Sequence, residues 1–286
     1  MHVPVMLAEC LEYLAVRPDG VYLDTTTGLG GHSGAIAQGL SAGFVIANDR
    51  DAESLEQAKL NTSEWADRIR FHQGAFSELR SALAELGIER VDGLLADLGV
   101  SRYQLTEPER GFSLMADGPL DMRQDRSQEL TAAEIVNFTP EKELADLIYQ
   151  LGEERRSRRI SRAIVRARPI HSTLRLSRVI EETVPRTSRI HPATQTFQAL
   201  RMAVNNEQGE LDQLLAIAPD LVRSGGRIVV LSFMSLEDRK VKQCFQTLAR
   251  AGRASILTKH VVRPSAEETI DNPPSRSAKL RALEMK

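Results

Sequence analysis

Three carboxylates stand at the ends of apolar runs that are typical of β-strands. Asp24, Asp49 and Asp97 each close such a run. Helix-forming segments separate the runs, and this alternation predicts a parallel sheet with its site at the carboxyl ends of the strands. A carboxylate there can accept hydrogen bonds from sugar hydroxyls or from an exocyclic amine. We therefore expect a site for a nucleotide-like ligand at this edge.

A glycine-rich turn follows the first of these runs. Gly28, Gly30 and Gly31 allow positive φ and the close approach of a ligand. The next segment, Ala35–Leu40, can begin a helix whose free N–H groups attract an anion. The usual Gly-x-Gly-x-x-Gly spacing is not met, because Ser33 stands where its third glycine would be. A tight turn in any α/β domain has the same composition, so that interpretation stays open.

Asp49 lies 21 positions after Gly28, where a carboxylate can accept hydrogen bonds from both hydroxyls of a bound ribose. NAD and S-adenosylmethionine both carry that ribose, so Asp49 does not distinguish them. Phe76 follows the third predicted strand, where its ring could lie against an adenine. The alternatives are a solvated carboxylate at Asp49 and an ordinary core side chain at Phe76.

The composition is that of an ordinary globular protein of 286 residues, with 42% hydrophobic and 27% charged residues. A formal net charge of −2 argues against a uniformly basic nucleic-acid binder, so any basic surface must be local. Cys10 and Cys244 form neither a disulfide framework nor a cysteine zinc site. The first residues lack a secretion signal, and no apolar stretch is long enough to span a membrane. We expect a cytoplasmic protein without membrane contact.

Helices and strands alternate at both ends of the chain. In the first part we expect elements at 5–16, 21–24, 35–40, 44–49, 52–60, 69–72, 77–86 and 91–97. In the last part we expect a helix at 210–222, a turn at 224–226, a strand at 227–233, a helix at 236–251, a strand at 255–262, a loop at 263–276 and a strand at 278–285. The fold class is therefore α/β, with an all-α subdomain inserted at about 106–208.

Only helices are predicted between about 131 and 206. Thr131 and Glu134 form a capping box, and another helix begins at Pro140. Segment 153–168 carries seven arginines beside a narrower apolar stripe, which predicts a basic amphipathic helix. Guanidinium groups match phosphate oxygens, although a solvated face partly balanced by acids has the same pattern. The positive region continues with Arg175, Arg178, Arg186 and Arg189.

Nine ordered motifs cover nearly the whole chain. They are Gly30–Ser33, Asp49–Asp51, Asp97–Ser101, Glu109–Ser113, Asp117–Arg123, Gly152–Arg155, His191–Thr194, Ser235–Arg239 and Ser275–Arg281. Together they resemble the bacterial small-subunit ribosomal RNA cytosine-N4 methyltransferases, the RsmH or MraW family. The resemblance implies methylation of the exocyclic N4 of a cytidine in the ribosomal decoding centre, with S-adenosylmethionine as cofactor. It also implies a Rossmann-like domain at 1–105 and 209–286 and an inserted RNA-recognition domain at 106–208.

The resemblance also assigns residues to the site. By position, the cofactor contacts of the family fall on Gly30, Gly31, His32, Asp49, Phe76, Asp97 and Gln104. Of these, His32 and Gln104 have no signal of their own in the sequence. The long loop at 109–123, the basic helix and the strand at 227–233 add candidates for substrate contact, which are Arg110, Asp121, Arg123, Arg155, Arg159 and Ser232.

The acceptor atom sets the catalytic requirement. The lone pair of cytosine N4 is delocalised into the ring, so an acceptor must pull on its hydrogens while N4 lies in line with the sulfonium methyl. We expect Asp97 to be this acceptor as well as a neighbour of the cofactor, with Ser232 and Asp121 as alternatives. Transfer to N4 needs neither a cysteine nucleophile nor a metal, and no cluster of metal ligands is evident.

The chain departs from the family pattern at three places. The family usually has His at Met234, Arg at Gln195 and Gly-Thr-Phe-Gly at Thr25–Gly28. Two other functions stay open: an NAD-dependent oxidoreductase, which has no use for an arginine-rich helix, and a cofactor-binding RNA assembly factor without turnover. The sequence leaves undecided whether the chain is a monomer or a homodimer. It also does not decide between free small-subunit ribosomal RNA and the assembled small subunit as substrate.

Overall fold

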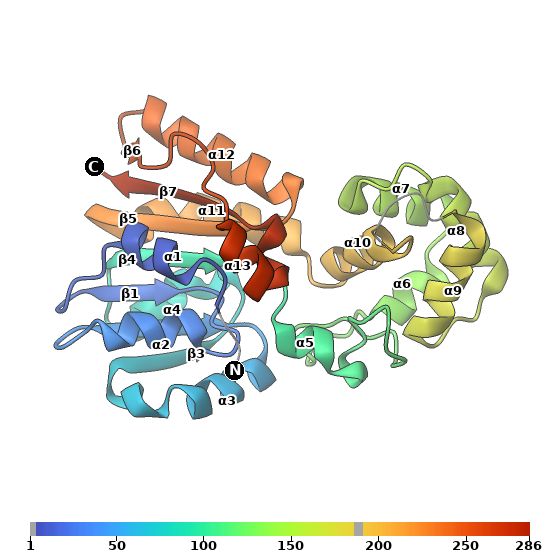
Figure 1. Ribbon diagram of the computed structural model, residues 1–286, viewed down its shortest axis with the longest axis horizontal. Helices are drawn as coiled ribbons and strands as arrows, with labels where there is room; N and C mark the ends of the chain where they lie inside the picture. Colours follow the sequence, from blue (N-terminus) through green and yellow to red (C-terminus); the bar gives the residue numbers. More distant parts are fainter. Residues whose placement is uncertain (1–3, 186–190) are drawn as a thin grey trace. The chain divides into compact units, whose positions relative to one another are not determined.

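The computed structural model describes residues 4–185 and 191–286. The chain divides into two compact units, which are considered separately (Figure 1). The first unit comprises Met1–Val100 and Gln208–Lys286, and the second comprises Ser101–Glu207.

The first unit is built on a seven-stranded sheet with the order β3-β2-β1-β4-β5-β7-β6. The strands are β1 (Val21–Asp24), β2 (Phe44–Asp49), β3 (Ile69–Gln73), β4 (Val91–Asp97), β5 (Val222–Ser232), β6 (Ala254–Ile256) and β7 (Lys279–Met285). The first five strands run parallel, as predicted, whereas β7 is antiparallel to both β5 and β6. The strand order reverses between β1 and β4, and ligands of open α/β sheets bind beyond the strand ends at such a point.

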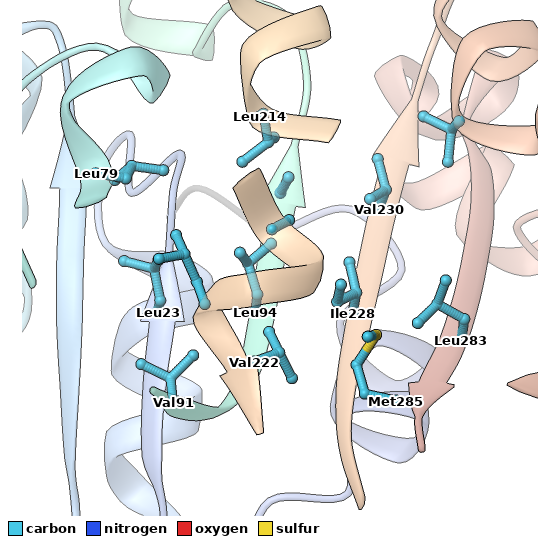
Figure 2. Close-up of a cluster of buried hydrophobic side chains, with 14 of the residues drawn as sticks. Leu23, Leu79, Val91, Leu94, Leu214, Val222, Ile228, Val230, Leu283 and Met285 are labelled. Carbon is cyan, nitrogen blue, oxygen red and sulfur yellow. The ribbon is translucent and has the colours of Figure 1, made fainter. Parts of the chain in front are cut away.

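Alternating side chains give the sheet two apolar faces. Leu23, Leu94 and Ile228 lie on one face, where they pack against α4 (Leu79–Glu85), α11 (Glu207–Leu221) and α12 (Ser235–Arg250) (Figure 2). Tyr22 and Val229 lie on the other face, against α1 (Leu7–Leu14) and α2 (Gly31–Gln38). A further helix, α3 (Ala52–Asn61), packs against β2 and β3. Burial on both faces explains the nearly continuous apolar runs of the central strands.

Four predicted elements of this unit differ from the structure. The helix expected from Ala35 begins at Gly31, and the strand expected at 255–262 ends at Ile256. The turn expected at 224–226 lies inside β5, where Gly225 has φ 76° and the register with β4 shifts. The loop expected at 263–276 contains α13 (Ala266–Asp271) and a 3-10 turn, η4 (Pro273–Ser277). The side chain of Ser265 caps α13 by accepting a hydrogen bond from the Glu268 N–H.

The described part of the second unit contains helices and no strand, as predicted. Its elements are α5 (Arg102–Thr106), η3 (Pro108–Arg110), α6 (Ala132–Phe138), α7 (Glu141–Gly152), α8 (Ser157–Ala167), α9 (Thr173–Thr183) and α10 (Thr194–Val204). The capping box is confirmed, because the N–H of Thr131 donates to Glu134 and the N–H of Glu134 donates to Thr131. The basic helix begins at Ser157 because Glu153, with φ 53°, ends the preceding helix. Arg186 and Arg189 lie outside the described residues.

Candidate cofactor and active site

The loop that leaves β1 is tied to the end of β4 at the point where the strand order reverses. The N–H of Thr25 donates to the Leu95 carbonyl over 2.9 Å. The N–H of Asp97 donates to the Thr26 hydroxyl over 2.6 Å. These bonds hold the polypeptide between β1 and α2 beside the carboxyl end of β4. The predicted glycine loop and the Asp97 carboxylate therefore share one edge of the sheet.

Asp97 is the most perturbed acid at this edge. Its side chain is 24% exposed, yet its Oδ1 atom is buried and has no hydrogen-bond partner among the described residues. Burial, together with the negative charges of Asp24 and Glu237, raises the pKa of Asp97 to about 8. An unpaired carboxyl oxygen with a high pKa is suited to receive a hydrogen from a bound ligand.

His32 lies behind Asp97 in the first turn of α2. Its Nδ1 atom is 3.9 Å from Asp97 Oδ2, and its Nε2 atom is 3.1 Å from the Val5 carbonyl. A carbonyl can only accept, so Nε2 must carry the hydrogen of this bond. The N–H of Met6 donates to Glu268 Oε1 over 2.6 Å, which holds the same N-terminal segment in place. His32 is thus buried and oriented by the chain around it.

Asp49 lies at the end of β2, as predicted, and is partly buried. Its Oδ2 accepts from the Gly28 N–H over 2.7 Å, and its Oδ1 accepts from the Asp51 N–H over 3.0 Å. Burial raises the pKa of Asp49 to about 6, and these backbone hydrogen bonds oppose the rise. Each carboxylate oxygen can accept a second hydrogen bond, so contact with a ribose remains available to Asp49.

Asp24 is a structural acid of the site that the sequence marked only as a strand end. It is fully buried and accepts from the Ser33 hydroxyl over 2.6 Å and from the Thr26 N–H over 3.1 Å. Burial raises its pKa to about 6. These bonds connect β1 to α2 across the glycine loop and fix the shape of that loop.

Two glycines of the loop are required by packing within the protein. A Cβ at Gly30, where φ is 87°, would lie 2.8 Å from the Thr62 side chain, and one at Gly31 would lie 2.5 Å from the Pro4 side chain. Packing is therefore a reason for glycine at both positions, and contact of their backbone with a ligand stays a prediction. Phe76 is partly buried in the short helix η2 (Phe76–Glu78) and packs against the first apolar face. This packing makes Phe76 part of the edge of the core, and contact of its ring with an adenine stays a prediction.

The end of β5 presents little free polar surface. Ser232 is buried, and its hydroxyl lies 3.5 Å from the Lys279 carbonyl. Met234 precedes α12, and its N–H donates to Glu237 over 3.0 Å. The N–H of Phe233 donates to the same carboxylate. Glu237 therefore caps α12 whatever side chain stands at position 234.

In the second unit, two predicted contact residues have structural partners. Gln104 is buried and forms a capping box with Ser101, whose N–H donates to Gln104 Oε1 over 2.9 Å. Arg110 was expected at the substrate but is only 2% exposed, and it donates to the Arg123 and Gln124 carbonyls over 2.9 and 3.2 Å. The prediction for Arg110 is corrected on this ground, because its guanidinium holds the loop at 109–123 together.

The remaining predicted substrate residues differ in exposure. Arg123 donates to both oxygens of Asp121 over 2.7 and 3.0 Å. Although burial pushes the pKa of Asp121 upward, the hydrogen bonds and charge of Arg123 outweigh it and keep that pKa below its usual range. Asp121 is therefore an ionised partner of Arg123 in this unit. Arg155 and Arg159, in contrast, are exposed.

The described part of the chain contains neither a metal cluster nor a membrane-spanning helix. Its His, Cys, Asp and Glu side chains form no group of three or more that could hold a metal ion. No helix within residues 4–185 and 191–286 is long and apolar enough to cross a membrane.

Comparison with known proteins gives the family. The model of the MraW methylase family matches residues 1–286. The chain belongs to the MraW methylase family. It is 67% identical over 286 residues to the ribosomal RNA small subunit methyltransferase H of Solibacter usitatus, with both chains covered in full. It is 51% identical over 295 residues to the protein of the same name from Acidobacterium capsulatum, covering 100% of this chain and 98% of the relative.

Membership of the MraW family confirms the resemblance found in the motifs and makes the chain a methyltransferase. A solved structure from Clostridium thermocellum, described as a candidate rRNA methylase, has a TM-score of 0.51 and 11% identity, and both chains are covered in full. At that identity the likeness concerns the fold alone. It agrees with the predicted Rossmann-like α/β class.

Proposed function

We propose that the chain transfers a methyl group from S-adenosylmethionine to the exocyclic N4 of a cytidine in the decoding centre of small-subunit ribosomal RNA. Family membership supports the substrate class, since the relatives are named as ribosomal RNA small subunit methyltransferases. The observation that carries the chemistry is the buried, unpaired Oδ1 of Asp97 at the carboxyl end of β4. Its position is suited to an amine donor of the acceptor base.

The residues at the strand ends fit the proposed cofactor. Besides Asp97 Oδ1, the Thr27 hydroxyl is buried without a hydrogen-bond partner among the described residues. Two orphaned polar atoms on one loop and one strand end indicate a polar ligand. When bound, S-adenosylmethionine supplies an electrophilic methyl group. The residues proposed to hold it are Gly30, Gly31, His32, Asp49, Phe76, Asp97 and Gln104.

Asp97 has two tasks in this proposal. Asp97 must be ionised to accept a hydrogen bond from the N4 amino group. The positive sulfonium of a bound cofactor beside the carboxylate would favour this ionised form. As the bond between N4 and the methyl carbon forms and the bond from that carbon to sulfur breaks, the amino group must release a proton. Asp97 takes up this proton, which its raised pKa favours.

The second unit is proposed to recognise RNA. We propose that the catalytic part comprises residues 1–105 and 209–286, and that the inserted part comprises residues 106–208. Arg155, Arg159 and the ion pair of Asp121 with Arg123 are the candidate RNA contacts, and Ser232 stays a candidate in the first unit. We further propose that the protein acts in the cytoplasm, on small-subunit ribosomal RNA that is either free or part of the assembled small subunit, as a monomer or a homodimer.

The test is transfer of tritiated methyl groups to small ribosomal subunits from cells that lack this modification. Asp97→Asn is compared with Asp220→Asn, an exposed acid that pairs with Arg80 and Arg253. We expect Asp97→Asn to lower transfer about 100-fold or more, as loss of general base catalysis does, and the control to stay active. Full activity in Asp97→Asn would remove Asp97 from the proposal. Cofactor binding without transfer by the unmodified protein would favour the assembly factor, and binding of NAD instead would favour the oxidoreductase.

A further inference from the structure

One side of α8 is covered by arginines. At about 100° per residue, Arg158, Arg159, Arg162 and Arg166 fall within about 100° of the helix circumference. All four are exposed, while Ile160 on the opposite side is buried. Two further exposed arginines stand on the neighbouring helix α9. We call the exposed arginines of these two helices the arginine face: Arg158, Arg159, Arg162, Arg166, Arg175 and Arg178.

The charge of the arginine face is nearly uncompensated. Among its members, Arg162 forms an ion pair with Glu141 over 3.5 Å, and both side chains of that pair are exposed. The other five have no carboxylate partner within the described residues. Five unpaired guanidinium groups on two helices that pack together repel one another, which an anionic partner would relieve. Because the formal net charge of the whole chain is −2, this concentration of positive charge is a local feature of α8 and α9.

Phe138 lies beside this face and is unusually exposed. It is the last residue of α6, and 80% of its surface is accessible. Arg168, directly after α8, donates to the Val136 and Thr139 carbonyls over 2.7 and 2.5 Å, so its guanidinium binds the backbone on both sides of Phe138. The ion pair of Arg162 with Glu141 also holds the middle of α8 near the start of α7, which follows Phe138 closely in the chain.

The turn from α8 to α9 is fixed to the same place. Asn137 donates to the Ile170 carbonyl over 2.8 Å and accepts from the Ile170 N–H over 2.8 Å. Arg166 and Arg175 stand just before and just after this turn. The exposed Phe138 therefore lies near the turn between α8 and α9, the end of these helices at which Arg166 and Arg175 stand. Within this unit α6 contacts α8, which in turn packs against α9 (Figure 1).

We propose that the arginine face and Phe138 together bind a single-stranded segment of RNA, with guanidinium groups on its phosphates and one nucleobase stacked on the Phe138 ring. The proposal rests on the proposed function and names the surface that holds the substrate. Bases stack on exposed aromatic rings when they are not paired, which selects a single strand over a duplex. A lipid surface would require several apolar anchors along the helix, whereas the outer side of α8 carries arginines.

The test measures binding of a fluorescent 12-nucleotide oligoribocytidylate to the full-length protein, beside an abasic oligomer with the same number of phosphates. We expect Phe138→Ala to weaken binding of the oligoribocytidylate roughly tenfold and to leave the abasic oligomer unaffected. Phe138→Trp should restore the lost affinity. The matched control is Leu60→Ala, which removes an exposed apolar side chain of α3 in the first unit, and it should change neither affinity.

The arginines are tested by the salt dependence of binding. The triple variant Arg158→Gln, Arg159→Gln, Arg166→Gln should weaken binding of both oligomers. It should also reduce the slope of log K against log salt concentration by about 2, at about 0.7 per phosphate contact on a single strand. Arg80→Gln, at an exposed pair with Asp220, is the control and should leave the slope unchanged.

Three outcomes would overturn the proposal. They are wild-type affinity of Phe138→Ala for the oligoribocytidylate, an equal loss on both oligomers, and a slope that the triple variant leaves unchanged. If Phe138→Ala instead alters sedimentation without altering RNA binding, a second copy of the chain covers the ring and the proposal is wrong. The failure of the proposed function is separate, because these binding assays contain no methyl donor. A protein that binds as expected but transfers no methyl group refutes only the proposed reaction.

Discussion

Replacing Asp97 by asparagine should stabilise the protein, and the gain should grow with pH. The pKa of Asp97 is raised to about 8, so the folded state binds a proton that the unfolded chain releases near pH 4. The free energy of unfolding therefore falls as the pH rises through this interval. Asparagine has nearly the same shape and does not titrate, so the variant avoids this loss. It also avoids the repulsion from Asp24 and Glu237.

The expected size of the effect follows from the shift. A pKa raised from 3.8 to about 8 corresponds to about 6 kcal/mol of unfolding free energy lost between these limits. For a domain of this size that is about 10 °C or more in Tm. Thermal unfolding of both proteins at about pH 5 and about pH 9, at constant ionic strength, measures the difference. Asp220→Asn serves as the exposed control. A difference in Tm that is equal at both pH values would refute the raised pKa of Asp97.

Three further predictions concern the loops and the cofactor. Gly31→Ala should lower the unfolding free energy by about 1–3 kcal/mol in urea denaturation, because its Cβ would meet the Pro4 side chain; unchanged stability would show that the N-terminal segment yields. Arg110→Leu should cost at least about 2 kcal/mol by the same assay, since a buried and a partly buried carbonyl lose their donor, and a neutral effect would return Arg110 to the candidate RNA contacts. Asp49→Asn should weaken S-adenosylmethionine binding at least about tenfold in calorimetry while RNA binding stays the same; unaltered cofactor affinity would exclude Asp49 from the ribose contact.

The central strands could be predicted from the sequence because both of their faces are buried. A strand such as Val91–Asp97 is then apolar at nearly every position, which few other local structures require. The chain around α13 could not be read in this way. That helix has six residues, none of them buried, so its sequence contains no apolar periodicity. Its start was marked only by the Ser265 cap, inside a segment whose prolines suggested a loop.

The sequence predicts where the candidate site lies and only part of its chemistry. Asp97 stands at a strand end, which is a local feature of the sequence. Its raised pKa depends on Asp24 and Glu237, which the fold brings near from distant parts of the chain. The burial of Arg110 could not be predicted from the sequence, because arginine is rarely buried. Its guanidinium is satisfied by the Arg123 and Gln124 carbonyls, which come near it only in the folded loop.

The same limit applies to Phe138. At the end of an amphipathic helix an aromatic residue is typical of the core, and its 80% exposure follows from where α6 ends. Neither its sequence neighbours nor the arginine pattern of α8 indicates that the two lie together. The bonds of Arg168 to the backbone around Phe138 make the connection, and they cross from one helix to another.

The most direct test of the proposed reaction is the identity of the methylated nucleoside. Small ribosomal subunits that lack the modification are incubated with this protein and S-adenosylmethionine carrying a deuterated methyl group, and their RNA is digested and analysed by mass spectrometry. N4-methylcytidine carrying the label is the predicted product. Label on C5 of cytidine, on a ribose 2′ oxygen, or on no nucleoside at all would contradict the proposed function.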